Sequence, residues 1–350
     1  MELRASHEKM IEAVLEKARR CCPDGLDLLG VYGSAATGDM HEKSDLDLLI
    51  VPSGEETGRR LARTFILDDE QVGYDLYCTS WEALESDAEC IHSQLGKLMD
   101  SIIVFEKNGS VRDRLEALRS KASRILASDE RFRKAREASE RMRMPYADAL
   151  LSGIMAEKRA YAAYVISLSL DAVMLYNGRY FRRGTKRTFE ELEGLSLPEG
   201  FRDAVNAVIQ AGDSESIDAA LTRLVRSVLS FTGTEEQRPV PDGESLRGTY
   251  EEMVSNWRNK MTEAAENRDA FSSFMNMASL QFMLAGIAGN ADIPEFHVMK
   301  DFRADDLGKN AKAFDGILEE YLLEYEKAGM KPLIYGNIDE FVREYLGGNL

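Results

Sequence analysis

Two aspartates separated by one residue form the part of the sequence best suited to binding a metal ion. Asp45 and Asp47 flank Leu46 and open an apolar run at 48–51. Side chains of a β-strand alternate between its faces, so we expect both carboxylates on one face of a strand at 45–51. Carboxylates this close repel each other by about 1 kcal/mol in water, and a cation or a shared proton relieves that repulsion. Hard oxygen ligands, with substrate phosphates, favour Mg²⁺.

A glycine and a serine precede these aspartates. Gly33 and Ser34 follow a short apolar run at 26–32 that has the length of a strand, and a polar loop of ten residues separates them from Asp45. Glycine allows close approach of the backbone to a ligand, and the serine hydroxyl with nearby N–H groups can hold a phosphate. Either feature alone is common in ordinary turns and strands. Their combination predicts a site for metal-bound phosphates.

The same residues resemble the nucleotidyltransferase superfamily, which includes DNA polymerase beta and the aminoglycoside and lincosamide nucleotidyltransferases. The segments VYGSAATG and SDLDLLIV match its signature at the expected spacing. The resemblance covers residues 26–105 and implies a third carboxylate on a neighbouring strand, for which Asp75 is suitably placed. Many members carry arginine where this chain has Thr37, so the phosphate or structural contact of that arginine does not carry over.

The resemblance implies a transferase of the EC 2.7.7 type. We expect a nucleoside monophosphate, AMP from ATP, to pass to a hydroxyl of a small-molecule acceptor with release of pyrophosphate. Asp45 and Asp47 would hold Mg²⁺ on the triphosphate, and Asp75 would orient a second metal ion or the acceptor oxygen. Two alternatives stay open: transfer to a protein or RNA acceptor, and an inactive nucleotide-binding regulatory module.

A basic run follows a long apolar helix predicted at 146–176. Residues 179–187 contain five basic and no acidic side chains. In small-molecule nucleotidyltransferases with a helical second domain, a basic residue from this region reaches the triphosphate, so the resemblance implies Lys186 and Arg183 as nucleotide-binding residues. A solvated basic loop is the alternative. Glu157, within the long helix, is a candidate general base, although a salt bridge or a solvent-facing position explains it equally well.

The predicted elements place this site in an α+β fold. A helix at 7–20, strands at 26–32, 45–51, 71–78 and 101–105, and helices at 55–67 and 81–99 alternate over the first hundred residues. We therefore expect a nucleotidyltransferase α/β domain with a small mixed sheet at 1–109.

Beyond residue 109 every periodic segment predicts helix, so an all-helical region follows. We expect a helical bundle domain at 110–235 and an additional C-terminal helical domain at 245–350. The polar stretch 232–244, with two prolines and two glycines, is the best candidate for a linker. A cluster of methionine and aromatic side chains at 271–283 predicts buried helical core rather than a binding surface.

The amino-acid composition limits the classes of partner that we expect for this protein. The net charge of −17 argues against nucleic acid, because phosphates would be repelled at long range. The N-terminal residues lack the apolar stretch of a signal peptide, and the apolar segment 160–176 is too short and too charged to span a bilayer. Four cysteines without a C-x-x-C pair indicate reduced thiols. We expect a cytoplasmic protein without membrane contact; the sequence leaves its oligomeric state open.

Overall fold

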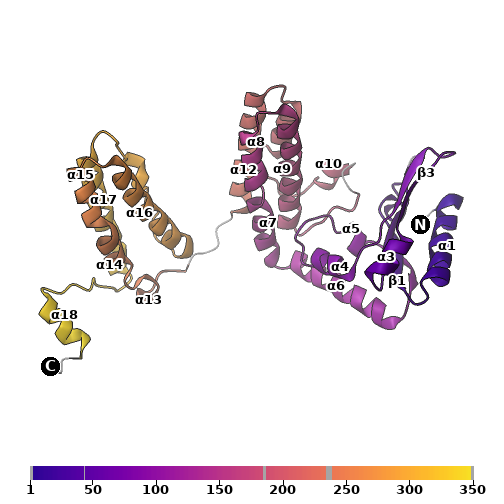
Figure 1. Cartoon of the computed structure of the whole chain (residues 1–350), viewed down its shortest axis with the longest axis horizontal. Coiled ribbons are helices and arrows are strands. Elements are labelled where there is room, and N and C mark those ends of the chain that lie inside the picture. The colour runs from indigo at the N-terminus through magenta and orange to yellow at the C-terminus, as the bar shows by residue number, and fades with distance from the viewer. Residues whose placement is uncertain (1–2, 43, 184–186, 234–238, 348–350) are drawn as a thin grey trace. The chain divides into compact units, whose positions relative to one another are not determined.

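The computed structural model describes residues 3–42, 44–183, 187–233 and 239–347. The chain forms two compact units, Met1–Thr234 and Glu235–Leu350 (Figure 1). Their boundary falls inside the predicted linker at 232–244. In the described residues, strands occur only before residue 107 and helices make up most of the remainder, which confirms the predicted α+β class. The further division of the first unit near residue 109 stays a prediction.

A three-stranded sheet in the order β2-β1-β5 lies at the centre of the N-terminal part. Its strands are β1 (Leu26–Tyr32), β2 (Asp47–Pro52) and β5 (Ile102–Glu106), and both pairings are antiparallel. β1 has the bounds predicted for it. β2 begins at Asp47, so the predicted strand at 45–51 starts two residues too early. The reason is that Asp47 pairs with Tyr32, the last residue of β1, and the chain then turns at Gly33, which leaves Asp45 without a strand partner.

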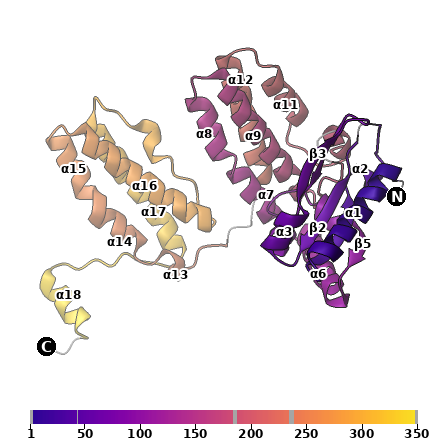
Figure 2. The same ribbon diagram turned by 45° about the vertical axis from the view of Figure 1, so that its right-hand side comes forward.

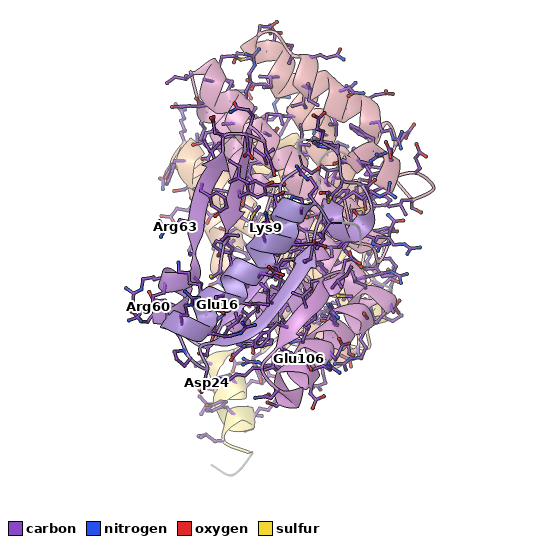
Figure 3. The ribbon with its side chains drawn as sticks, turned by 90° about the vertical axis from the view of Figure 1, so that its right-hand side faces the viewer. Lys9, Glu16, Asp24, Arg60, Arg63 and Glu106 are labelled. Carbon is purple, nitrogen blue, oxygen red and sulfur yellow. The ribbon has the colours of Figure 1, made fainter. Side chains whose placement is uncertain are left out.

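Both faces of this sheet are buried, because helices cover each side. Leu29 and Ile50 pack with the apolar side of α1 (Ala5–Cys21), whereas Leu28 and Leu49 pack with α4 (Trp81–Ala88) and α6 (Gly109–Ala127) on the other side. Lys9 and Glu16 mark α1 in the view of Figure 3, where the helix lies beside the strands. The continuous apolar run at 48–51 follows from this two-sided burial.

A two-stranded antiparallel ladder, β3 (Arg63–Leu67) with β4 (Val72–Leu76), adjoins the sheet. The predicted helix at 55–67 was therefore wrong beyond α3 (Glu55–Leu61). Its second half, Arg-Thr-Phe-Ile-Leu, contains β-branched and aromatic residues that pair with β4 across a tight turn. After β4 the chain reaches the sheet through a parallel bridge between Cys78 and Ile50. This bridge gives the otherwise antiparallel arrangement its mixed character.

The predicted helix at 81–99 is interrupted. It consists of α4 (Trp81–Ala88) and α5 (Gly96–Met99), separated by a bend at which Cys90 has φ of 52°. The buried carboxylate of Asp171 holds this bend, because its Oδ1 accepts hydrogen bonds from the backbone N–H of Ser93 at 2.8 Å and from the Ser93 hydroxyl at 2.6 Å. A carboxylate distant in sequence therefore fixes a conformation that local periodicity does not show.

Helices complete the first unit. They are α6 (Gly109–Ala127), α7 (Glu130–Glu140), α8 (Arg143–Leu151), α9 (Met155–Tyr176), α10 (Thr188–Glu191), α11 (Phe201–Gln210) and α12 (Ser214–Thr232). Figure 2 shows α8, α9, α11 and α12 running alongside one another. The predicted helix at 146–176 is broken into α8 and α9 at 152–154, and α11 was not predicted. The central part of α9 is buried against α7 and α12, which makes it the core helix of this bundle.

The second unit is helical throughout its described residues. Its elements are α13 (Gly243–Leu246), α14 (Thr249–Met253), a π-helical turn (Val254–Arg258), α15 (Asn259–Glu266), α16 (Ala270–Asn290), a 3₁₀ turn (Val298–Asp301), α17 (Leu307–Lys327) and α18 (Ile338–Tyr345). The core is formed mainly by α14–α17, where Leu280, Leu284, Phe314 and Tyr321 are fully or almost fully buried.

The prediction that the methionine and aromatic cluster at 271–283 is core was largely wrong. Met277 is buried, but Phe271 and Phe282 are 74% and 76% exposed, and Phe274 and Met275 are also exposed. The cluster spans all sides of α16, and only one side faces the other helices. Among the described helices, α16 alone is long and apolar enough to cross a membrane; core helices of soluble proteins pass the same test.

Candidate active site

The first element of the site is the sharp turn at the end of β1. Gly33 has φ of 65° and ψ of −147°, a conformation essentially restricted to glycine. Ser34 then begins the short helical turn α2 (Ser34–Thr37), which ends at Gly38 with φ of 78°. The absence of a side chain at Gly33 also makes room for Asp47, because a Cβ atom placed there would lie 2.0 Å from Oδ2 of Asp47. The turn therefore brings backbone and serine directly beside the β2 carboxylate.

The paired aspartates project as their spacing predicts. Asp45 is exposed and Asp47 is half-buried, whereas Leu46 and Leu48 are 2% and 4% exposed. This alternation puts both carboxylates on the side of the chain opposite Leu46 and Leu48, which pack in the same core as the apolar side of α1. Asp47 is anchored by its strand pairing with Tyr32, and Asp45 lies on the irregular segment just before it. The two carboxylates therefore share a side but differ in how firmly the backbone holds them.

Asp75 reaches the site from the separate ladder. It is exposed on β4, and its Oδ1 accepts a hydrogen bond of 2.9 Å from the hydroxyl of Thr64 on β3. The end of β4 is tied to the sheet, because the N–H of Thr79 donates to the carbonyl of Ile50 at 2.9 Å. β2 and β4 thus lie close together, as the predicted placement of Asp75 requires.

The negative charges of Asp45, Asp47 and Asp75 all influence the pKa of Tyr32. Burial first, and then the negative charges of Asp47, Asp45 and Asp75 in that order, together with a smaller contribution from Asp87, raise the pKa of the Tyr32 phenol to about 12. A negative field disfavours the phenolate, so each of these carboxylates adds to the shift. Tyr32 was not singled out from the sequence. Its position directly before Gly33 was the signal that could have identified it.

The three carboxylates do not form a closed metal cage. Over the residues that the structure describes, no group of three or more His, Cys, Asp or Glu side chains is arranged to hold a metal ion. Mg²⁺, however, is usually held by one or two carboxylates, substrate phosphates and waters rather than by an all-protein cage. The hard, neighbouring oxygens of Asp45 and Asp47 fit a metal ion that arrives with a nucleotide. Their convergence with Asp75 in one metal site stays a prediction.

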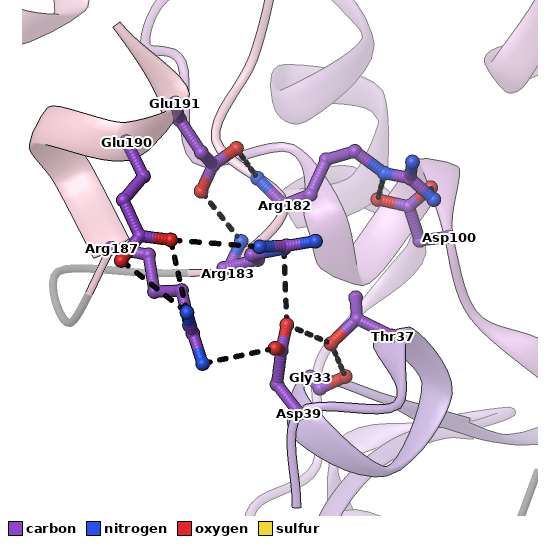
Figure 4. A network of polar contacts seen from close by, with 9 residues as sticks. All are labelled: Gly33, Thr37, Asp39, Asp100, Arg182, Arg183, Arg187, Glu190 and Glu191. Atoms are coloured by element: carbon purple, nitrogen blue, oxygen red, sulfur yellow. Dashed lines mark hydrogen bonds and ion pairs between the residues drawn. The ribbon is translucent and has the colours of Figure 1, made fainter. Parts of the chain in front are cut away.

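The basic run predicted to meet the triphosphate lies beside the glycine and serine turn. Nε of Arg183 is 3.0 Å from Oδ2 of Asp39, and Arg187 is 3.5 Å from the other oxygen of that carboxylate (Figure 4). Asp39 in turn accepts a hydrogen bond of 3.3 Å from the hydroxyl of Thr37. Asp39 and Arg187 were missed as candidates; Asp39 lies in the loop between Ser34 and Asp45, and Arg187 ends the basic run.

A cavity of about 250 Å³ lies between these two segments. Its lining consists of Ser34, Thr37, Asp39, His41, Arg183, Arg187 and Glu190. Two arginines and Ser34 therefore line one hollow in a chain that is strongly acidic overall. Two exposed or partly exposed carboxylates, Asp39 and Glu190, balance the arginines there.

Carboxylates hold the basic segment in place. Both oxygens of Glu191 accept backbone N–H groups, from Arg182 and Arg183, each at 2.9 Å. The side chain of Arg182 pairs with Asp100 (Figure 4). Asp100 also accepts a hydrogen bond of 3.0 Å from the hydroxyl of Tyr180. These contacts hold the backbone at Arg182 and Arg183, and Arg183 lines the same cavity as Ser34.

Lys186 and Glu157, the two other candidate residues, are not among the described residues that line the cavity. Lys186 lies outside the described residues. Glu157 lies in the first turn of α9 and accepts a hydrogen bond of 2.8 Å from the Ser152 hydroxyl in the break before that helix. It is exposed, and it is not among the described residues lining the cavity. The structure therefore places Gly33 against Asp47 and puts Ser34 and Arg183 in the lining of one cavity, whereas Glu157 has a local contact instead.

Comparison with known proteins agrees with the N-terminal geometry. Residues 8–126 match the family model described as nucleotidyltransferase domain. The chain has no match among curated proteins. A solved structure, a nucleotidyltransferase-like protein from Exiguobacterium sibiricum, is 11% identical, with a TM-score of 0.36 over 69% of this chain and 84% of that one. That likeness is too distant to carry an argument. Residues 8–126, about a third of the chain, are therefore similar to nucleotidyltransferase domains.

Proposed function

We propose that this protein transfers AMP from ATP to a hydroxyl group of a small-molecule acceptor and releases pyrophosphate. The domain match supports nucleotidyl transfer in general. The observation that carries the finer proposal is the cavity in which Ser34 from the glycine and serine turn faces Arg183 and Arg187. Its volume of about 250 Å³ is below that of typical sites for whole drug-sized ligands, so we assign it to phosphate groups.

The charges suit a triphosphate. The arginines present planar, permanently charged donors that bind phosphate oxygens in pairs. Both side chains are about two-fifths exposed, so a ligand can reach them without unfolding the segment. Ser34 supplies a hydroxyl donor from the opposite wall of the same cavity.

The carboxylates would hold the metal ion that accompanies the nucleotide. Asp45 and Asp47 are the residues that would bind Mg²⁺, which supplies charge neutralisation at the phosphates when bound. Gly33 keeps the Asp47 carboxylate against the turn, because any side chain there would displace it. Tyr32 stays a neutral phenol beside these carboxylates at neutral pH, since its pKa is raised to about 12.

The transfer step is a displacement at the α-phosphorus. A bond forms between the acceptor oxygen and that phosphorus while the bond to the bridging oxygen of pyrophosphate breaks. The acceptor hydroxyl must lose its proton, and we assign Asp75 to orient that hydroxyl and to accept the proton. Its exposure on β4, with the Thr64 hydroxyl holding only one of its oxygens, leaves the other oxygen for this contact.

Pyrophosphate release tests the proposal. ATP and Mg²⁺ would be supplied with a panel of small hydroxylated acceptors, with RNA, or with a protein extract, and Asp47→Asn would serve as the inactive control. We expect release that depends on Mg²⁺ and on a small acceptor. Release that depends on RNA or protein alone would assign the acceptor to a macromolecule. Tight nucleotide binding without any release would favour a regulatory module.

A further inference from the structure

The second unit carries an apolar surface that none of its described helices covers. Six positions of α16, spaced four and three residues apart, project away from the core formed with α15 and α17. They are Phe271, Met275, Ala278, Phe282, Ala285 and Gly289. At 3.6 residues per turn they fall within roughly 80° of the helix circumference. We call these six positions the α16 stripe.

Packing within the unit does not explain the α16 stripe. Leu280 and Leu284, on the opposite side of α16, are fully buried, whereas Phe271 and Phe282 are about three-quarters exposed. A Cβ atom added at Gly289 would meet nothing within 4 Å. At about 200 Å² for each large side chain, the exposed parts of Phe271, Met275 and Phe282 amount to roughly 400 Å² of apolar surface. An apolar patch of this size on a soluble protein is often functional.

We propose that the α16 stripe is the interface of a homodimer in which two copies of α16 pack antiparallel across a two-fold axis near Leu280. Such an axis brings together residues at equal distances on either side of Leu280. Each large side chain then meets a small one. Phe271 faces Gly289 of the other copy, Met275 faces Ala285, and Phe282 faces Ala278. A parallel pairing would instead place phenylalanine on phenylalanine and glycine on glycine.

The surface beside the small residues has the matching hollow. A cavity of about 210 Å³ is lined by Gln281, Ala285, Ala288, Gly289, Glu295, Phe296 and His297. The antiparallel arrangement directs Phe271 of the second copy toward this cavity. The stripe is therefore self-complementary, which is what a two-fold interface requires.

Charge and area also fit a second copy. α16 contains no charged residue between Ala270 and Asn290, so two copies of a chain with net charge −17 can meet there without burying like charges. Two copies of the stripe supply about 800 Å², and the exposed part of Phe274 beside it raises the total to about 1,000 Å², which is the size that a biological interface should exceed.

A lipid bilayer fits the same helix less well. Burying all of α16 in lipid would expose the core side of the unit, where Met277, Leu280 and Leu284 pack against α15 and α17. The polar residues Ser272, Asn276 and Gln281 interrupt the apolar composition. A protein surface covers the stripe without this loss.

Analytical ultracentrifugation of the full chain tests the proposal with two substitutions that exchange a large and a small side chain across the interface. We expect the wild type to sediment at twice the chain mass. Ala285→Met introduces a clash with Met275 of the other copy, and Met275→Ala leaves a void, so each should weaken the dimer at least about tenfold, equivalent to about 1.4 kcal/mol. The double variant exchanges the two sizes across both symmetry-related contacts and should restore dimerisation.

Leu323→Ala is the matched control, because Leu323 is exposed on α17 outside the stripe and its loss should leave the dimer unchanged. Far-UV circular dichroism would show that every variant folds. A wild type that is monomeric at all concentrations would overturn the proposal, as would a double variant no better than the worse single one. Flotation of a monomeric wild type with phosphatidylcholine vesicles would assign the stripe to a membrane instead.

Discussion

Gly33 and Asp47 lie so close that a Cβ atom on the glycine would be 2.0 Å from Oδ2 of the aspartate. The two residues are not neighbours in the sequence; the antiparallel pairing of Tyr32 with Asp47 brings them together. The glycine of the turn and the second aspartate of the pair therefore form one structural unit. This contact explains in physical terms why a metal-binding carboxylate would need glycine, rather than any small residue, at the end of β1.

Replacing this glycine should disturb the site more than strain alone would. Gly33→Ala imposes both a positive φ on alanine and a clash with Asp47, so we expect a loss of unfolding free energy beyond the roughly 1–3 kcal/mol of strain, together with weakened binding of ATP and Mg²⁺. Gly38→Ala is the matched control, because φ is also positive there but nothing lies within 4 Å of the added Cβ. Equal effects of the two substitutions on urea unfolding and nucleotide binding would refute the role given to the contact.

Replacing Asp47 by a neutral side chain should abolish nucleotidyl transfer without destabilising the fold. Asp47→Asn keeps the size of the side chain but removes one charge from a pair that repels, so the melting temperature without metal should be unchanged or slightly higher. Transfer that depends on Mg²⁺ should be lost. Asp69→Asn, in the exposed turn between β3 and β4, should change neither quantity. A large drop in melting temperature for Asp47→Asn would show a structural role instead.

The basic segment should contribute to ATP binding through its phosphates. A charge-assisted contact is worth about 1.5–3 kcal/mol, so Arg183→Ala should weaken ATP binding roughly ten- to a hundredfold, and less at high salt. We predict the same range for Lys186→Ala. Arg179→Ala is the control from the same run, because Arg179 is exposed and is not among the described residues lining the cavity. If titration calorimetry finds the same ATP affinity for Arg183→Ala and Arg179→Ala, the segment is solvated surface and does not bind ATP.

Asp39 should compete with the nucleotide for the two arginines. Its carboxylate pairs with Arg183 and Arg187 in the structure, and partly exposed ion pairs are worth about 0.2–1 kcal/mol each. Loss of both pairs should therefore tighten ATP binding in Asp39→Asn by roughly two- to thirtyfold. Weaker binding in calorimetry would mean that Asp39 instead holds the arginines in their binding position. Glu56→Gln, which removes an acceptor from two arginines on α3, controls for the loss of an exposed carboxylate.

A buried histidine should make the stability of the first unit depend on pH. Burial and the charge of Arg4 lower the pKa of His7 from 6.5, with Glu70 and Asp45 opposing. The unfolded chain then binds the proton more readily, so the unfolding free energy should be highest above pH 6.5 and fall as the pH drops below it. His7→Gln should flatten this dependence. Urea unfolding followed by Trp81 fluorescence in a Trp257→Phe background reports on this unit, and His297→Gln in the other unit should leave the dependence intact.

The sequence predicted those parts of the fold that local pattern determines. β1 matches its expected bounds because an apolar run is enclosed by Gly25 and Gly33, and the alternation at Asp45, Leu46 and Asp47 gives the correct side for both carboxylates. β3 was missed because its partner β4, rather than its own periodicity, determines its conformation.

Long-range contacts explain what the sequence could not show. The pairing of Asp39 with Arg183 joins residues 144 positions apart, and neither residue carries a local sign of the other. The exposure of Phe271 and Phe282 likewise depends on which side of α16 meets α15 and α17. Composition alone made the whole helix resemble core.

Calorimetric titration of ATP into the full chain, with Mg²⁺ and with a chelator, tests whether Asp45 and Asp47 bind the nucleotide through a metal ion. We expect ATP to bind the wild type in the presence of Mg²⁺, chelation to weaken binding strongly, and Asp47→Asn to remove the difference between the two conditions. The reason is that Asp45 and Asp47 repel the triphosphate unless a cation lies between them. Equal ATP affinity of the wild type with and without Mg²⁺, or the same Mg²⁺ dependence in Asp47→Asn, would contradict this expectation.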